Sequence, residues 1–341
     1  MQQKKLNVGV IGTGAMGSRH AHNLAHRTPT ADVVAIMDVD EVRASEVAAA
    51  CGRATIYNDG NALIGDEAVE AVVIASPDQT HADLAIACIE AGKPVLCEKP
   101  LGVTLDDAAR VLKAEAAHGA RLVQVGLMRI YDPYHVMIKE AIERGAIGRP
   151  VLFRGIHKNV AFPQARTAED VIVNSGVHDI HSARWLMGDE VVSVHADHVI
   201  DLPERPETAR LTLLQLRFRQ GGLATIEVDA DSHYGYDVRV EISGERGTLE
   251  TPDADVSAVH FQDGKASRLV NQEWLARFES AYRLEAEAWV DVAARGTAAG
   301  ASVWDGYAAM CVADAAIRSL TSGRAEVVNA EPRPSLYDPI A

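Results

Sequence analysis

The chain has 341 residues, of which 48% are hydrophobic and 24% are charged, as is typical of soluble globular proteins. At roughly 150 residues per domain, this length predicts about two domains. The formal net charge of −15 argues against a sequence-independent grip on nucleic acid or on an anionic membrane surface, because both need clustered lysine and arginine. The negative charge does not exclude the binding of a small anionic ligand, since a helix N-terminus can bind phosphate without any basic side chain.

Short apolar strands and alanine-rich helices alternate over the first 126 residues. Strands are predicted at residues 8–11, 33–37, 71–75, 94–97 and 122–125, and helices at 15–26, 41–50, 81–91 and 106–118. Such alternation predicts βαβ units around a parallel sheet, and the almost continuously apolar strands indicate that both faces of the sheet are covered. We therefore expect residues 1–126 to form an α/β domain with a Rossmann-type, doubly wound sheet.

The pattern changes beyond about residue 150. A strand is predicted at 151–159 and a helix at 174–187, followed by alternating strands at 191–199, 209–219, 223–231, 236–243 and 247–250 and by helices at 273–294 and 302–319. Gly221 and Gly222 indicate a hairpin. We expect residues 127–341 to form an α+β domain with a large, mostly antiparallel open sheet, whose final helices can pack back on the first domain. The acid-rich residues 201–207 are predicted to be a surface connection.

The strongest local signal is the run Gly12-Thr13-Gly14-Ala15-Met16-Gly17, which follows the first strand and opens a helix. Glycines in this context bring the backbone close to a pyrophosphate, although they also suit a plain tight turn. Asp38 ends the second strand, where its carboxylate can bind the ribose hydroxyls of NAD. Val39 and the two acids after it disfavour a 2′-phosphate. We therefore expect NAD to bind along residues 12–17, Asp38 and Val39.

Two later loops of this sheet reach the same edge. One begins with Ser76 and Pro77 and leads to His81, and the other contains Glu98 and Lys99. Loops at the carboxyl ends of the strands line the ligand crevice of a doubly wound sheet, so these five residues are expected near the cofactor. Lys99 is also a candidate catalytic ammonium. The alternatives are a capped turn for the first loop and a solvated lysine in the second.

A histidine on the predicted 174–187 helix is the second candidate for proton transfer. Asn174 and His178 are four residues apart and are expected to share one face of this helix. Histidine suits proton abstraction near neutral pH, although a lone helical histidine is often structural. His178 and His181 offer half a metal site without a third ligand, so no metal is expected.

Polar residues also alternate along two predicted strands. His157 and Asn159 are expected on one face of the first strand, and Tyr234 and Tyr236 are expected to share a face near the start of another. Such pairs suit the recognition of hydroxyl groups, and the alternative is an ordinary solvent-exposed face.

The cysteines indicate neither a zinc site nor a disulfide framework. No CxxC pair occurs among Cys51, Cys88, Cys97 and Cys311, which we expect to be small buried apolar residues. The start of the chain shows no signal-peptide pattern, and no apolar run approaches the roughly 20 residues that span a bilayer. We therefore expect a soluble, cytoplasmic protein.

Taken together, these residues resemble the Gfo/Idh/MocA family of NAD(P)-dependent oxidoreductases. The likeness covers nearly the whole chain, and it rests on the glycine run, residues 76–81, Glu98-Lys99-Pro100 and the helical His178. Within the family the chain is most similar to the inositol dehydrogenases, in stretches within 128–133, 157–159, 177–186 and 234–242. The Glu-Lys-Pro run together with the histidine-bearing helix is specific, whereas the glycine run alone is not.

The resemblance implies a role for each of these positions. Lys99 corresponds to the lysine that hydrogen-bonds the reacting hydroxyl and steers protons, and His178 corresponds to the general base. The positions that line the polyol site are implied to be Arg129, His157, Asn159 and Tyr236.

One position departs from the family pattern. The family commonly has an aspartate four residues before the catalytic histidine, where this chain has Asn174. Asparagine supplies no charge, so the pKa values of Lys99 and His178 are expected to be lower than in relatives with the aspartate. We expect Lys99, Arg129 and His178 to stand without this usual aspartate, which would make the active site the least acidic part of an acidic chain.

The resemblance implies an NAD-dependent dehydrogenase that transfers hydride between a ring hydroxyl of a small cyclic polyol or sugar and the nicotinamide, with a proton relay through Lys99 and His178. The alternatives are a pyranose dehydrogenase, an NAD-dependent glycosidase that returns the hydride, and a non-catalytic NAD-sensing regulator. Relatives commonly form dimers or tetramers through the free face of the second sheet. We therefore expect a homo-oligomer, a tetramer or a dimer, with no nucleic-acid or membrane partner.

Overall fold

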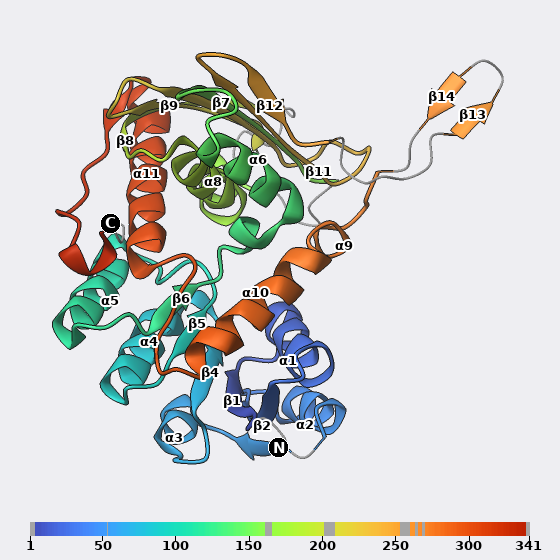
Figure 1. Ribbon diagram of the computed structural model, residues 1–341, viewed down its shortest axis with the longest axis vertical. Helices are drawn as coiled ribbons and strands as arrows, with labels where there is room; N and C mark the ends of the chain where they lie inside the picture. The colour runs from blue at the N-terminus through green and yellow to red at the C-terminus, as the bar shows by residue number, and fades with distance from the viewer. Residues whose placement is uncertain are drawn as a thin grey trace. The chain divides into compact units, whose positions relative to one another are not determined.

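The computed structural model describes residues 4–52, 54–160, 166–200, 209–252, 260–262, 265–267 and 270–338. The chain divides into two compact units (Figure 1). The first comprises Met1–Met128, Ala281–Ala308 and Glu331–Ala341, and the second comprises Arg129–Ser280 and Ala309–Ala330. The first unit is thus assembled from both ends of the chain.

A parallel sheet forms the centre of the first unit, in the order β3-β2-β1-β4-β5-β6. Its strands are β1 (Leu6–Ile11), β2 (Ala31–Met37), β3 (Thr55–Tyr57), β4 (Ala71–Ile74), β5 (Val95–Cys97) and β6 (Val123–Val125). The strand order reverses between β1 and β4, which is where doubly wound sheets bind their ligands. The predicted Rossmann-type parallel sheet is therefore confirmed.

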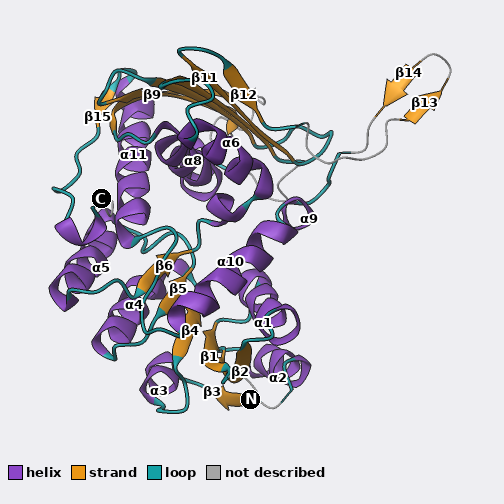
Figure 2. Cartoon of the chain, in the orientation of Figure 1, coloured by secondary structure: helices purple, strands orange, loops and turns teal. Residues whose placement is uncertain are grey.

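Helices flank this sheet (Figure 2). They are α1 (Ala15–Arg27), α2 (Glu41–Ala50), α3 (Gly60–Gly65), α4 (His81–Glu90), α5 (Leu105–His118) and most of α10 (Glu279–Ala293). The Asp40 side chain caps α2, and Thr104 forms a capping box with Asp107 at the start of α5. Trp289 of α10 is fully buried in the same apolar cluster as Val8 of β1, so a segment from late in the chain completes this core.

The second unit is built on a sheet in the order β12-β11-β7-β10-β9-β8-β15. Its strands are β7 (Pro150–Lys158), β8 (Val191–Ile200), β9 (Ala209–Phe218), β10 (Leu223–Asp229), β11 (Asp237–Gly244), β12 (Thr248–Glu250) and β15 (Glu326–Val327). Neighbouring strands are antiparallel except β7 and β10, which are parallel. The predicted mostly antiparallel sheet is confirmed, and Gly221 lies in the β9–β10 hairpin as expected.

Helices of the second unit pack against one face of its sheet (Figure 1). The elements are α6 (Pro133–Glu143), α7 (Ala168–Val171), α8 (Val177–Met187), α9 (Trp274–Arg277) and the later part of α11 (Val303–Ser322), besides a short β13 (His260–Gln262) and β14 (Lys265–Ser267) hairpin. Phe153 of β7 and Ile226 of β10 share an apolar cluster with Ile180 and Leu186 of α8. Because strand residues alternate between faces, His157 lies on the same face of β7 as Phe153.

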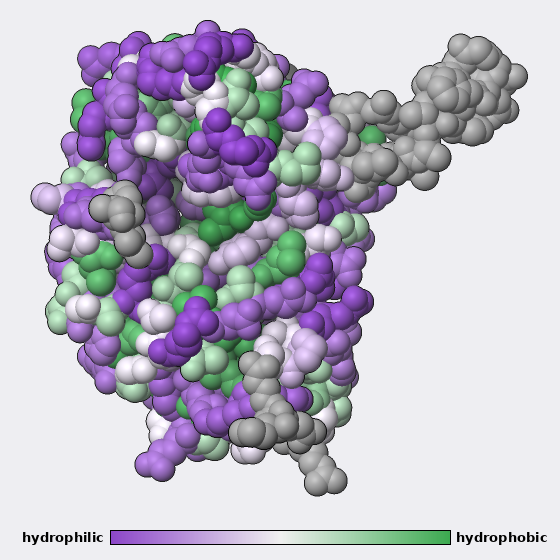
Figure 3. Space-filling model, viewed as in Figure 1, coloured by the Kyte–Doolittle hydropathy of each residue, from purple (hydrophilic) through white to green (hydrophobic). Residues whose placement is uncertain are grey.

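The opposite face of this sheet is polar in part. Ion pairs join Arg154 to Glu241 and Lys158 to Glu227 across neighbouring strands. The view in Figure 3 is mainly hydrophilic, with apolar residues in separate small areas. Among the described residues, most large apolar side chains are buried in the two cores.

Several elements differ from the sequence-based expectation. The sequence pattern did not indicate β3, α3 or α6, which are short or carry a mixed pattern. The helix predicted over residues 174–187 is present, but it is not α-helical from its start, because Ile172–Gly176 form a π-helical turn between α7 and α8. Residues 201–207, predicted to be a surface connection, lie outside the described residues.

No helix in the described ranges combines the length and the apolar character needed to cross a bilayer.

Glu285 is a buried acid of the first unit. Both carboxylate oxygens of Glu285, on α10, lack a hydrogen-bond partner among the described residues. Burial raises the pKa of Glu285 well above its usual range, and the nearby Glu98 carboxylate raises it further. The folded protein therefore favours the neutral, protonated form of Glu285 more than the unfolded chain does.

We expect Glu285→Gln to raise the melting temperature at pH 8 and to have little effect at pH 4. Above the ordinary glutamate pKa of about 4.3, the unfolded chain loses this proton and the folded chain keeps it. The contribution of Glu285 to wild-type stability therefore falls as the pH rises above about 4.3, whereas a glutamine at this position does not titrate. Thermal unfolding from pH 4 to pH 8 measures the difference. Glu287→Gln, on the same helix and partly exposed, is the control, and a pH-independent gain at Glu285 would contradict the assignment.

Candidate cofactor and substrate sites

The loop between β1 and α1 is shaped by close backbone contacts. A Cβ atom on Gly12, which has a φ of 90°, would lie 2.5 Å from the carbonyl oxygen of Ala75, and one on Gly17 would overlap the carbonyl oxygen of Gly12. Gly14 instead faces open space and begins α1 without a side-chain cap, and the first turn of α1 carries no acid. The free backbone N–H groups of Ala15 and its neighbours therefore suit the pyrophosphate of a dinucleotide.

The carboxylate of Asp38, at the end of β2, is held by four donors. Its Oδ2 accepts from the backbone N and the Oγ1 of Thr13 at 2.6 and 2.7 Å, and its Oδ1 accepts from the Asp40 N and from Arg43 at 2.9 and 2.8 Å. Although partial burial raises it, these hydrogen bonds hold the pKa of Asp38 well below its usual range. Asp38 is thus a fixed, ionised carboxylate beside the glycine loop.

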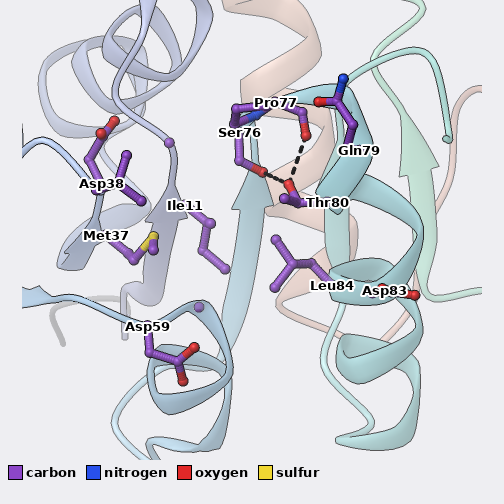
Figure 4. Close-up of a pocket in the computed structure, with 13 residues that line it drawn as sticks. Ile11, Met37, Asp38, Asp59, Ser76, Pro77, Gln79, Thr80, Asp83 and Leu84 are labelled. Carbon is purple, nitrogen blue, oxygen red and sulfur yellow. Dashed lines mark hydrogen bonds between the residues drawn. The ribbon is translucent and has the colours of Figure 1, made fainter. Parts of the chain in front are cut away.

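A cavity of about 370 Å³ opens next to this carboxylate. In Figure 4, Ile11, Met37 and Leu84 converge on its apolar floor, while Asp38 and Asp59 lie at its rim. The exposed Val39 and residues from the Ser76–Thr80 loop complete the lining. An apolar pocket with an acidic rim suits an adenosine, whose flat base has apolar faces and whose ribose hydroxyls are donors.

The loops after β4 and β5 are joined through a buried histidine. The Nδ1 of His81 lies 2.7 Å from the carbonyl oxygen of Pro100, and its Nε2 lies 2.8 Å from that of Ser76. Thr80 bonds both the Ser76 hydroxyl and the Pro77 carbonyl, as Figure 4 shows. The His81 ring therefore connects the two loops that were predicted to meet the cofactor, and its own contact with a cofactor stays a prediction.

Glu98 and Lys99 follow β5 in the first unit. The carboxylate of Glu98 is buried and lies 2.8 Å from the Nε2 of His20 on α1. A Cβ on Gly126 would approach this carboxylate to 2.9 Å, so the glycine leaves it room. Glu98 therefore ties the Lys99 loop to α1, and Lys99 itself is partly exposed.

In the second unit, Asp179 is the centre of a buried polar cluster. Arg129 pairs with Asp179 through contacts of 2.5 and 3.3 Å, and the Nδ1 of His157 lies 2.7 Å from the Oδ2 of Asp179. Although burial raises it, Arg129 and His157 hold the pKa of Asp179 well below its usual range. Arg129, expected to stand without the usual family aspartate, is thus paired with a different carboxylate, that of Asp179.

Tyr236 completes this cluster. Its hydroxyl lies 3.1 Å from the Nε2 of His157, and burial raises its pKa to about 12. Tyr234 was expected on the same face as Tyr236, but the two differ in burial: Tyr234 is 48% exposed and Tyr236 is 6% exposed. Both residues precede β11 and flank Gly235, whose φ is 157°, so the alternation of a regular strand does not apply to them. Asn159 is buried one residue beyond β7, where its side chain donates to the backbone oxygen of Asp229.

The π-helical turn alters the relation between Asn174 and His178. Asn174 lies in this turn and donates to the backbone oxygen of Asp170, whereas His178 is buried at the start of α8. A shared face does not follow from the spacing of four, since that rule holds for an α-helix. π-helical turns are frequent at functional sites, which the sequence pattern could not indicate.

The structure thus brings the predicted residues together in two groups. The first unit gathers the glycine loop, Asp38 and the two loops joined by His81, and the second gathers the cluster around Asp179. Lys99 and His178 belong to different units. Among the described residues, no group of three or more histidine, cysteine or acidic side chains could hold a metal ion. Sequence reasoning missed Asp179 and Arg43, although an acid next to a candidate histidine was a usable signal.

Comparisons with known proteins agree with this arrangement. Residues 6–127 match the model of an oxidoreductase family with an NAD-binding Rossmann fold, and residues 135–250 match the GFO/IDH/MocA C-terminal domain. The chain belongs to the Gfo/Idh/MocA family.

Individual relatives extend over almost the whole chain. An inositol 2-dehydrogenase of Rubrobacter xylanophilus is 46% identical, over 98% of this chain and 96% of that protein. An inositol 2-dehydrogenase/D-chiro-inositol 3-dehydrogenase of Shouchella clausii is 37% identical, over 97% and 96%. The structure of a Lactobacillus casei myo-inositol dehydrogenase in complex with NAD(H) and myo-inositol has a TM-score of 0.93 and 30% identity, covering 98% of this chain and 100% of that one. This family member is an NAD-dependent dehydrogenase of CH–OH groups.

Arg43 has a consequence for cofactor binding. A carboxylate offers about four acceptor positions, and Asp38 already fills them. A ribose hydroxyl can bond Asp38 only if one donor withdraws, and the Arg43 side chain, 48% exposed, is the donor with the most freedom. Arg43 therefore competes with the ribose of NAD, and its positive charge would favour a 2′-phosphate.

We expect Arg43→Met to tighten NADH binding several-fold and to weaken NADPH binding. The first effect follows from an acceptor position freed on Asp38, and the second from the lost cation. Fluorescence titrations with both cofactors measure these changes. Arg295→Met, at an exposed arginine of the same unit, should leave both affinities unchanged. Weaker NADH binding after Arg43→Met would show instead that this side chain holds the cofactor.

Proposed function

We propose that this chain oxidises a ring hydroxyl of an inositol, with NAD as the hydride acceptor. The observation that carries the proposal is that one chain contains both a dinucleotide loop and a buried polar cluster around Asp179. Asp179 is the residue directly after His178 in the sequence. The identity to proteins named inositol 2-dehydrogenase over almost the whole chain supports this substrate.

Two side chains handle the proton in this proposal. His178 accepts the proton of the reacting hydroxyl, and the Lys99 ammonium donates a hydrogen bond to the same oxygen, which stabilises the negative charge that develops there. The two residues lie in different units, so the reaction requires that both reach one hydroxyl. Bound NAD supplies the hydride acceptor.

The proposed cofactor is NAD rather than NADP. The ionised carboxylate of Asp38 suits the two hydroxyls of an unmodified ribose and repels a 2′-phosphate. Asp40 and Glu41, which follow at the start of α2, add to this repulsion. Arg43 opposes it, and the titrations described above measure the balance.

Asn174 supports a second candidate, the dehydrogenation of a pyranose. The family commonly has an aspartate at this position, and the amide of Asn174 brings no negative charge to the turn before His178. A site without this charge can prefer a different set of hydroxyls. The glycosidase and the non-catalytic regulator remain outcomes of the activity screen below.

We also propose that the chain forms a homo-oligomer through the outer face of the second sheet. Ile156, Leu211 and Leu213 are only partly buried on that face, between the cross-strand ion pairs. A sheet face with exposed apolar residues favours contact with a second copy.

We expect NAD reduction with myo-inositol, and a loss of about 10²–10⁴-fold in kcat for Lys99→Ala and for His178→Ala. The loss follows from removing the group that stabilises the oxygen or the group that takes its proton. A spectrophotometric screen over inositol isomers and common pyranoses, with each cofactor, measures the activity. Lys113→Ala, at an exposed lysine of the first unit, is the control.

The outcomes separate the candidates. Reduction of NAD by pyranoses alone would favour the second candidate, and turnover of a glycoside without net NADH would indicate a glycosidase. Cofactor binding without turnover on any polyol would indicate a regulator. Wild-type rates in both alanine variants would refute the roles of Lys99 and His178.

A further inference from the structure

The buried cluster of the second unit contains a histidine whose protonation is set by its neighbours. The Nδ1 of His157 lies 2.7 Å from Oδ2 of Asp179 and 3.1 Å from a guanidinium nitrogen of Arg129. Asp179 is ionised and can only accept a hydrogen bond, whereas the guanidinium can only donate one. The Nδ1 atom can therefore satisfy one of these two neighbours and not both.

The shorter contact decides between them. An unprotonated Nδ1 at 2.7 Å from a carboxylate oxygen would place two lone pairs against each other in a buried site. A proton on Nδ1 turns the same contact into a charge-assisted hydrogen bond. Arg129 keeps its own bonds to Asp179, so it does not need the imidazole as an acceptor.

The other ring nitrogen meets a tyrosine. The Tyr236 hydroxyl lies 3.1 Å from Nε2 of His157, with the two rings edge to face. Burial raises the pKa of Tyr236 to about 12, so the hydroxyl keeps its proton. In the Nδ1–H tautomer of the imidazole, Nε2 is an acceptor and Tyr236 is the donor.

We propose that Asp179 is a positioning residue that holds His157 in the Nδ1–H form and thereby directs the Tyr236 hydroxyl proton toward Nε2. Tyr236 then presents only its oxygen lone pairs to a bound ligand. This inference rests on the proposed function in one respect, namely that the ligand is a polyol. Where the polyol meets Tyr236, the site prefers a ligand hydroxyl that donates a hydrogen bond. A ligand oxygen without a hydrogen would face another acceptor there.

The same unit contains a second triad of this composition, which serves as a matched control. Asp132 pairs with Arg277 at 2.8 Å and with Nδ1 of His135 at 2.6 Å, and all three side chains are buried. The Nε2 of His135 has no hydrogen-bond partner among the described residues, in contrast to that of His157. The two triads therefore share their Asp–Arg–His composition and differ in the hydrogen bond from the histidine to a tyrosine.

The first test is neutron diffraction from wild-type crystals at neutral pD. We expect deuterium on Nδ1 of His157, directed at Asp179, and on the Tyr236 oxygen, directed at Nε2. Deuterium on Nε2, alone or together with Nδ1, would overturn the proposal. This result does not depend on which polyol is the substrate, so it stands even if the inositol screen fails.

The second test compares Asp179→Asn with Asp132→Asn. We expect Asp179→Asn to raise KM for the polyol at least tenfold while the dissociation constant of NADH is unchanged. Asp132→Asn should lower the melting temperature without that change in KM. In a Tyr236→Phe background, Asp179→Asn should raise KM no further, because the directed hydroxyl is gone. An equal rise in KM from Asp179→Asn and Asp132→Asn would show that Asp179 is merely structural. If Asp179→Asn does not fold, the neutron result alone decides.

Discussion

The cost of removing charge from water governs the interior of both units. An isolated charge in a protein core is far less stable than one in water, so buried charges are paired or neutralised. In the second unit this constraint places Asp179 against Arg129 and fixes both side chains. In the first unit Glu285 meets the same constraint differently, by keeping its proton. The positions of these buried polar groups are thus set by electrostatics as well as by shape.

The first unit was predictable because its signals are local and periodic. Buried parallel strands are apolar along their whole length, and Gly12 and Gly17 are required where the backbone approaches itself too closely for a Cβ. The position of Asp38 follows from the length of one βαβ unit. These features need no knowledge of distant contacts, so the sequence pattern was sufficient for the sheet apart from β3, for its helices apart from α3, and for the glycine loop.

The parts that could not be predicted depend on contacts between distant residues. The place of Asp179 next to His178 is a usable signal, but nothing in the sequence indicates its partners Arg129 and His157, which are 50 and 22 residues away. The π-helical turn at Asn174 leaves no periodic signal, because it inserts one wider turn between two helices. Tyr234 and Tyr236 look equivalent in the sequence until Gly235 turns the backbone between them. Tertiary packing decided each of these cases.

The order in which the first unit is assembled has a consequence for synthesis. Its sheet is complete by Val125, but α10, which buries Trp289 in the core beside that sheet, begins at Glu279. During translation the early strands must therefore wait for more than a hundred residues before this part of their apolar surface is covered. At ordinary elongation rates of about 5–20 residues per second, such a nascent chain exposes an apolar, aggregation-prone sheet face for many seconds. Chaperone binding during translation would protect this intermediate from aggregation.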